Sequence, residues 1–371
     1  MLTLMADLAP TIIPIVILYF EVLGIFGNVN LILATIRKKH LQTKHGVLLA
    51  LTSFYQLMCL LGELVNVSFA LSGVEIKRNM CFILMSPYLV FSCLQSTMFL
   101  VLALDVLIAI LFPLKHMVTR LGVYVSIASI PAVVYAVLIL SLAIAGMISM
   151  ETNPRILLCN PPLSVHPKVA SFWINWNGFS NLGVLVIYVA VYAVVSSREK
   201  PEESYVHCCN IFNFMLLGHY TNAYGSDKRE RKMGRIVMHS AERKVLISLL
   251  WLITVFASTW CTCNIILAIA AWFEQTQDVA AVQSYVVVFA LMAYSVNYYV
   301  YFTKNHAYRR VFLEQLAWIF PKRFFNGIYW NETGSRVGAL PSLRTPAANV
   351  ASRIERRNVG NGLNSSTPRR L

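Results

Sequence analysis

Three carboxylic acids, Glu21, Glu63 and Asp105, stand inside long apolar stretches of this chain. An ionisable group in hydrocarbon is costly, so it normally faces a cavity or a polar partner. Two interpretations of Glu63 remain open: it contacts a ligand, or it is protonated and hydrogen-bonded to a neighbouring helix. Asp105 lies near one end of its stretch, and we expect it to pair with Lys115 or Arg120.

Residues for enzymatic chemistry are not apparent. All eight histidines fall in the connections and the tail, which disfavours haem, intramembrane zinc and histidine proton relays. The sequence contains no H-E-x-x-H, G-x-S-x-G or P-loop motif. We therefore expect no enzymatic activity, no metal site and no cofactor.

The elements that must position these side chains are apolar helices. The chain is 57% hydrophobic and only 13% charged, unlike a soluble domain. Each stretch is long enough to cross about 30 Å of hydrocarbon as a helix, and none alternates as a barrel strand would. We predict an all-α membrane protein, a seven-transmembrane helix bundle over residues 11–302, with spans at 11–36, 46–71, 82–111, 122–150, 169–197, 245–273 and 279–302.

Basic residues predict the orientation of the bundle. Arg37, Lys38 and Lys39 lie in the first connection, Lys115 and Arg120 in the third, and most other Lys and Arg residues in 198–244 and after residue 302. Such faces are cytoplasmic. We expect a plasma-membrane protein with residues 1–10 extracellular and the carboxyl terminus cytoplasmic. The net charge of +14 then reflects topology and attraction to membrane lipids, without nucleic acid as a partner.

This topology separates the eight cysteines. Only Cys81 and Cys159 lie on the predicted extracellular face. A disulfide between them would tie the third helix to the loop after the fourth. The alternative is two free thiols, which an oxidising compartment disfavours.

The order of several short motifs resembles the rhodopsin-like G protein-coupled receptors over residues 11 to about 320. Within that superfamily the chain is most similar to nematode serpentine chemoreceptors of the sx class, through residues 48–56, 159–162 and 308–310. The motifs shared with the superfamily are Gly27-Asn28, the Cys81 and Cys159 pair, residues 104–113 with Asp105 and Pro113, Phe256-x-x-x-Trp260, and Asn297-Tyr-Tyr-Val-Tyr301.

The resemblance implies a chemosensory receptor. Such a receptor binds a small extracellular ligand within the bundle and signals to a heterotrimeric G protein by rearranging helices six and seven. The residues that the resemblance assigns to activation and coupling are Asn28, Gln56, Asp105, Val106, Phe256, Asn297 and Tyr301.

Several positions depart from the superfamily pattern. Val106 replaces the arginine that contacts the G protein, and Gln56 replaces an aspartate, so we do not expect sodium binding. Thr262 and Tyr298 replace prolines, which predicts that helices six and seven are straighter than usual. Helix seven has no lysine, which excludes a retinal Schiff base.

Helix geometry together with the resemblance selects candidate ligand contacts. Tyr88 replaces the aspartate of amine receptors, so an uncharged or weakly polar ligand is expected. The alternative for each residue is ordinary packing between helices. The candidates are Glu63; Met85, Tyr88, Leu89 and Ser92, which share a helix face; Trp260, Cys263 and Asn264; and Gln283 and Ser284.

After the last span, residues 303–320 predict an interfacial amphipathic helix, with apolar side chains at Tyr308, Val311 and Phe312. Residues 321–371 predict a disordered cytoplasmic tail whose serines and threonines would recruit an arrestin-like partner if phosphorylated; a merely solvated tail is the alternative. The apolar segment 205–217 is too short to span; it is a surface segment, an acylated one, or an insertion.

Two further function classes remain open. One is a receptor-like protein that does not activate G proteins, suggested by Val106. The other is a membrane transporter, which predicts internal repeats and broken helices. No repeat relates the two halves of this chain.

Overall fold

A computed structural model describes every residue except 1, 151, 157–158, 199–254, 271–276 and 320–371. The described residues fall almost entirely in one compact unit, Met1–Leu316, and the second unit, Ala317–Leu371, is described only to Ile319. The predicted loop segment 205–217 and the phosphate acceptors of the tail lie outside the described residues.

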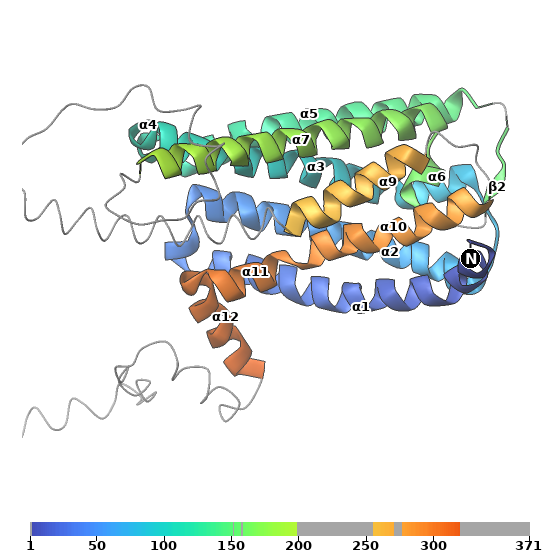
Figure 1. Cartoon of the computed structure of the whole chain (residues 1–371), viewed down its shortest axis with the longest axis horizontal. Coiled ribbons are helices and arrows are strands. Elements are labelled where there is room, and N and C mark those ends of the chain that lie inside the picture. The colour runs from blue at the N-terminus through green and yellow to red at the C-terminus, as the bar shows by residue number, and fades with distance from the viewer. Residues whose placement is uncertain (1, 151, 157–158, 199–254, 271–276, 320–371) are drawn as a thin grey trace, which may run out of the picture. The chain divides into compact units, whose positions relative to one another are not determined.

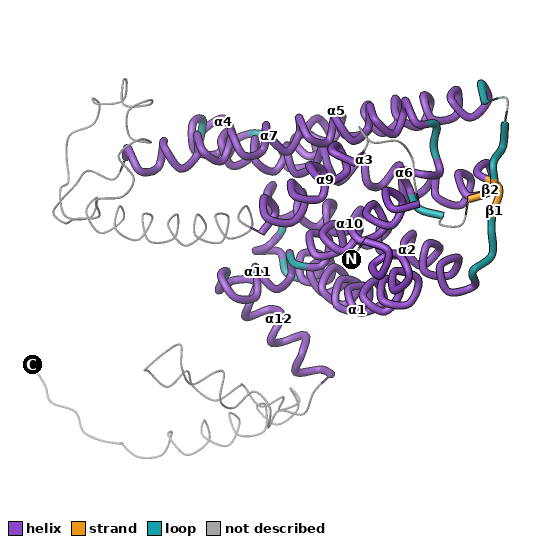
Figure 2. Tube along the Cα trace, turned by 45° about the vertical axis from the view of Figure 1, so that its right-hand side comes forward, coloured by secondary structure: helices purple, strands orange, loops and turns teal. Residues whose placement is uncertain are grey.

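Long apolar helices form the body of the first unit and run side by side (Figures 1 and 2). The helix α3 is central, since it packs against α2, α5 and α7, while α1 packs against α2 and α10. These lengths and compositions suit membrane spans and confirm the predicted helix bundle. The long helices are α1 (Leu2–Arg37), α2 (Lys44–Ser72), α3 (Arg78–Leu111), α5 (Leu121–Ile148) and α7 (Pro167–Arg198). The first begins before the predicted Thr11.

Local sequence explains where helices begin and approach one another. The Thr43 hydroxyl accepts a hydrogen bond from the Gly46 amide and caps the start of α2. Gly73 ends this helix in the left-handed conformation, with φ of 63°. At Gly27 a Cβ would lie 2.9 Å from the Cβ of Tyr298, so only glycine lets α1 come this close to helix seven.

Helix seven is bent, so the prediction that it is straighter than usual is wrong, and helix six departs from a regular α-helix. A π-helical turn, η2 (Ala257–Cys261), precedes α9 (Thr262–Ala270), and helix seven bends by 40° between α10 (Gln277–Ser295) and α11 (Asn297–Lys304). Hydroxyl side chains replace proline as the cause: Thr259 donates to the Val255 carbonyl, and Ser295 donates to those of Leu291 and Phe20. Such bonds compete with the helical ladder.

The predicted disulfide between Cys81 and Cys159 is confirmed, with Cα atoms 5.6 Å apart. Beside it β1 (Ile76–Lys77) pairs antiparallel with β2 (Arg155–Ile156), and α6 (Pro161–Ser164) follows. The loop between α5 and α7 is therefore fastened to the start of α3 at one end of the bundle, here called the disulfide end.

The opposite end carries three short helices, η1 (Lys39–Leu41), α4 (Pro113–Val118) and α12 (His306–Ile319). The sequence assigned the apolar side of α12 to a membrane surface. In the structure Tyr308, Val311 and Phe312 are buried, and the Phe312 ring lies 4.3 Å from that of Tyr298. The first turns of α12 thus pack on helix seven.

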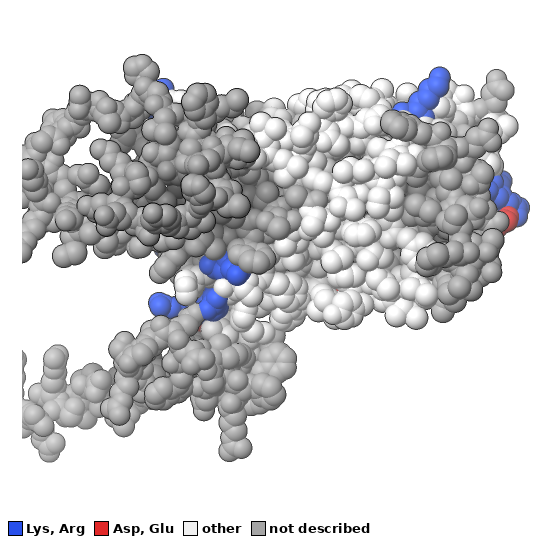
Figure 3. Space-filling model, viewed as in Figure 1, with Lys and Arg blue, Asp and Glu red and all other residues white. Residues whose placement is uncertain are grey.

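The outer surface of the bundle fits a hydrocarbon environment. On α5 the side chains of Ile127, Ile130, Val134 and Val137 are more than half exposed and recur at helical spacing. Figure 3 shows an uncharged middle zone on the face in view, with the coloured charged side chains toward the two ends. This pattern is expected of side chains that face lipid.

Candidate functional site

A pocket opens among α2, α3, α7, α9 and α10 near the disulfide end, with about 540 Å³ of empty space that includes open solvent. The tethered loop contributes part of its wall, which connects the disulfide to the shape of the pocket. The described lining consists of Glu63, Asn66, Tyr88, Asn160, Pro161, Pro162, Trp173, Ile174, Asn177, Trp260, Cys263, Asn264, Leu267, Val287 and Ala290.

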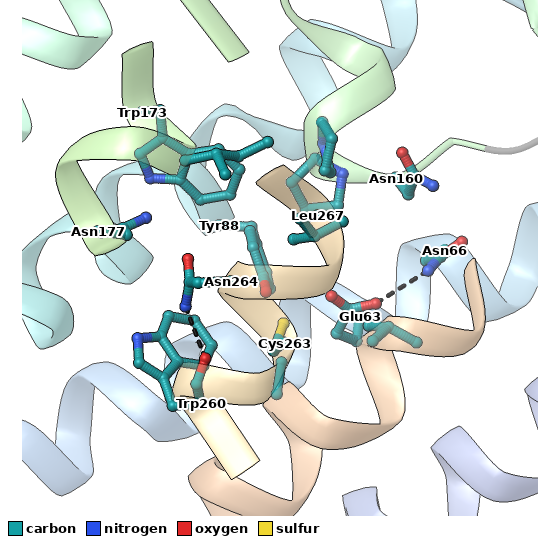
Figure 4. A pocket seen from close by; sticks show the side chains of 15 residues that line it. Glu63, Asn66, Tyr88, Asn160, Trp173, Asn177, Trp260, Cys263, Asn264 and Leu267 are labelled. Atoms are coloured by element: carbon teal, nitrogen blue, oxygen red, sulfur yellow. Dashed lines mark hydrogen bonds between the residues drawn. The ribbon is translucent and has the colours of Figure 1, made fainter. Parts of the chain in front are cut away.

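Glu63 is the one charged residue in this described lining, and its side chain is fully buried. Its Oε2 accepts a hydrogen bond of 3.0 Å from the Asn66 amide one turn along α2. Its Oε1 has no hydrogen-bond partner among the described residues, and Figure 4 shows this oxygen on the side away from Asn66. A ligand in the pocket would find an available carboxyl oxygen.

Aromatic rings connect the pocket to helix seven. The Tyr88 and Tyr294 hydroxyls lie 3.0 Å apart, and the Trp260 and Tyr294 rings are 5.4 Å apart. The backbone carbonyl of Tyr294 accepts a 3.0 Å hydrogen bond from the Asn28 amide of α1. Tyr294 is fully buried. Its side chain contacts the pocket wall, and its backbone contacts α1.

At the opposite end, Asp105 is the centre of a polar cluster and is 2% exposed. His45 Nδ1 lies 3.2 Å from its Oδ2, and His116 Nε2 lies 2.9 Å from its Oδ1. The Tyr124 hydroxyl donates to Oδ1 at 2.8 Å, and the Tyr301 hydroxyl lies 3.1 Å from His45 Nε2. This histidine cluster joins α2, α3, α4, α5 and α11.

The predicted pairing of Asp105 with Lys115 or Arg120 is therefore wrong. Both basic side chains are exposed, and the Lys115 ammonium lies over the Phe112 ring instead. The two histidines and Tyr124 are only partly exposed and bond to the buried carboxylate directly, whereas Lys115 and Arg120 stay at the surface.

A comparison with protein-family models decides the family. The model described as "Serpentine type 7TM GPCR chemoreceptor Srsx" matches residues 21–316, most of the chain. The chain belongs to this family. The resemblance inferred from the short motifs is thereby confirmed, and the Srsx chain is a multi-pass membrane protein of a receptor family rather than an enzyme family. No curated protein matches it in a sequence search.

The structure brings several predicted ligand contacts of this Srsx receptor together. Glu63, Tyr88, Trp260, Cys263 and Asn264 all line the pocket. Their role in binding remains a prediction. Met85, Leu89 and Ser92 are buried but lie outside this lining, and the side chains of Gln283 and Ser284 on α10 are outside the described ones.

Other residues of the pocket were missed by sequence reasoning. Asn66 lies three residues after Glu63 on the same helix face, and Trp173 and Asn177 repeat at four-residue spacing on α7. This helical spacing could have identified them from the sequence. The contribution of Asn160 and Pro161 could not be identified in this way, because it depends on where the disulfide holds the loop.

Several predicted activation residues make contacts between helices of the Srsx bundle, and their role in activation remains a prediction. Asn297 donates a 2.8 Å hydrogen bond to the Gln56 carbonyl oxygen, and the Phe99 and Phe256 rings are 4.5 Å apart. Val106 directly follows Asp105 in the sequence and is half-buried. Its side chain has no polar group that could hydrogen-bond to the histidine cluster. Sequence reasoning missed His45 and His116, because every histidine had been assigned to a connection.

The described residues contain no group of three His, Cys, Asp or Glu side chains arranged to hold a metal ion. The chemistry available in the described pocket is hydrogen bonding, charge pairing and aromatic contact.

Proposed function

We propose that this Srsx protein is a chemosensory receptor that binds a small extracellular ligand in the pocket and signals through helices six and seven. The observation that supports this most directly is the Tyr88–Tyr294 contact. It connects the pocket wall to helix seven, whose second segment, α11, carries Tyr301 of the histidine cluster. A ligand that displaces Tyr88 or Trp260 would act on Tyr294 directly.

The proposal includes the domain organisation and orientation. Residues 1–10 are extracellular, 11–302 form the receptor domain in the plasma membrane, 303–320 the amphipathic segment, and 321–371 the cytoplasmic tail. The partners are the ligand, a heterotrimeric G protein, an arrestin-like protein on the tail, and membrane lipids. No enzymatic activity is expected.

One observation favours a second candidate function. Val106 carries an isopropyl group at the position where the superfamily has the arginine that reaches the G protein, and no substitute for a guanidinium exists in that side chain. A receptor-shaped protein that binds ligand without activating G proteins is therefore the alternative. Membership in a receptor family argues against a transporter.

Coupling is tested by expressing the native protein and Val106→Arg with a panel of G proteins and measuring subunit dissociation in response to a small-molecule library. Responses in the native protein support the receptor proposal. Responses in Val106→Arg alone support the silent alternative.

The pocket is tested with Leu267→Trp, which fills the space beside Glu63, against Ile130→Trp on the exposed face of α5. We expect the first substitution to abolish the ligand response at equal surface expression and the second to leave it unchanged. Equal responses in both variants would contradict binding in this pocket.

A further inference from the structure

Glu63 and Glu21 both carry buried carboxyl groups in the apolar bundle, and neither makes an ion pair among the described residues. Glu21 on α1 is 2% exposed, and neither of its oxygens has a hydrogen-bond partner in the described part of the chain.

The described residues bring no basic side chain to the pocket. The described lining contains no Lys, Arg or His. The basic residues of the disulfide end, Lys77, Arg78, Arg155 and Lys168, all lie outside that lining. The sequence of the connection from α9 to α10 contains Glu274 and no basic residue, and Asp278 follows in the first turn of α10. An ionised Glu63 therefore requires a cation from outside the chain, because an unpaired buried charge is strongly disfavoured.

The walls around Glu63 suit an organic cation better than a metal ion. Tyr88, Trp173 and Trp260 supply aromatic faces, which attract ammonium groups but do not coordinate metals. Leu267 and Val287 add apolar surface for a hydrocarbon body. The Tyr88 and Tyr294 hydroxyls lie 3.0 Å apart, and either of them can be the donor. Glu63 Oε1 has no hydrogen-bond partner among the described residues.

From this arrangement we propose that the ligand is a small organic ammonium ion, with Glu63 as its counter-ion and the aromatic side chains around its hydrocarbon part. The sequence favoured an uncharged ligand because Tyr88 replaces the aspartate of helix three. The structure supplies a carboxyl group to the same pocket from α2 instead. This inference depends on the proposed function, since it names the ligand class of that site.

A binding measurement separates this inference from signalling. The full-length protein in lipid nanodiscs is titrated with a panel of primary arylalkyl and alkyl amines, each paired with the alcohol of the same skeleton, such as 2-phenylethylamine with 2-phenylethanol. Sodium and potassium chloride form a further arm. The readouts are the melting temperature and tryptophan fluorescence.

At least one amine should bind about tenfold or more tightly than its alcohol. In Glu63→Gln, which keeps the shape and the contact with Asn66, that preference should disappear. Glu63→Asp should retain part of it, and Glu75→Gln, which removes a charge from an exposed loop, should retain all of it.

If Glu63→Gln does not fold, the amine and alcohol comparison on the native protein still decides. The inference fails if no amine in the panel exceeds its alcohol, if inorganic cations produce the same stabilisation as the amines, or if the preference survives in Glu63→Gln. Binding of alcohols alone, abolished by Leu267→Trp, would reject the ammonium ligand and leave the receptor function in place.

Discussion

Asp105 accepts hydrogen bonds from groups on three other helices, and this is the densest polar contact that the structure describes. Superfamily members place an arginine directly after the corresponding acid, whereas Val106 follows here. The two histidines contact the Asp105 carboxylate, and His45 also lies within hydrogen-bond distance of Tyr301 on helix seven. At the scale of single residues, two imidazole groups hold together the ends of the helices that lie opposite the disulfide end.

This cluster predicts strong coupling between His45 and Asp105. A hydrogen bond to a charged group contributes about 1.5–3 kcal/mol, and removal of one partner leaves the other buried and unsatisfied. We expect His45→Ala and Asp105→Asn each to destabilise the protein, and the double variant to cost less than the two single changes together. Unfolding free energies of the detergent-solubilised protein measure this.

As a matched control, the same double-variant comparison is made with Asp105→Asn and Ser141→Ala. Ser141 is exposed on α5 and bonds only to the Val137 carbonyl of its own helix. Those two changes should be additive. Additive costs for His45 and Asp105 would show that their contact contributes no stability.

Individual side chains of the site were predictable where one helix decides their direction. Glu63 stood out because a carboxyl group in an apolar stretch needs a partner, and Tyr88 and Cys263 followed from helical spacing. His45 did not, because its role depends on the end of α2 meeting α3 and α11. Tyr294 was equally hidden, as one aromatic residue among many in an apolar helix.

At the scale of elements, the Cys81–Cys159 link determines how the loop before α7 contributes to the pocket. Asn160, Pro161 and Pro162 follow the second cysteine directly and line the pocket wall. The disulfide therefore supports a binding surface as well as the fold.

We expect Cys159→Ser to lower stability by about 2–5 kcal/mol and to weaken ligand binding by loosening Asn160–Pro162. Cys81→Ser should have the same effect, and the double variant should be no worse than either single one. The melting temperature and binding affinity, measured with and without reductant, test this. Wild-type affinity in both single variants would show that the link does not shape the pocket.

The positions of the helices were predictable from hydrocarbon thickness, because a span needs a long apolar stretch whatever its neighbours are. Their interruptions were not. The π turn at Ala257–Cys261 and the bend between Ser295 and Asn297 depend on hydroxyl groups bonding to backbone carbonyls. Serine and threonine in an apolar helix adopt several such geometries, so their presence alone predicts no bend.

At the scale of the whole molecule, orientation depends on the distribution of basic residues. We predict that an epitope tag before residue 1 is stained by antibody on intact cells, and that a tag after residue 371 is stained only after permeabilisation. Flow cytometry of cells expressing each tagged form measures this. Staining of both tags on intact cells would contradict an odd number of spans, and staining of the second tag alone would reverse the orientation.

The position of Tyr294 has a mechanical consequence. The residue stands directly before the 40° bend of helix seven, with its ring against Trp260 of the pocket wall and its carbonyl bound to α1. Under the proposed function, a ligand that moves Trp260 or Tyr88 acts on Tyr294 beside a fulcrum, where a small local rotation becomes a larger displacement at the far end of the lever, at Tyr301.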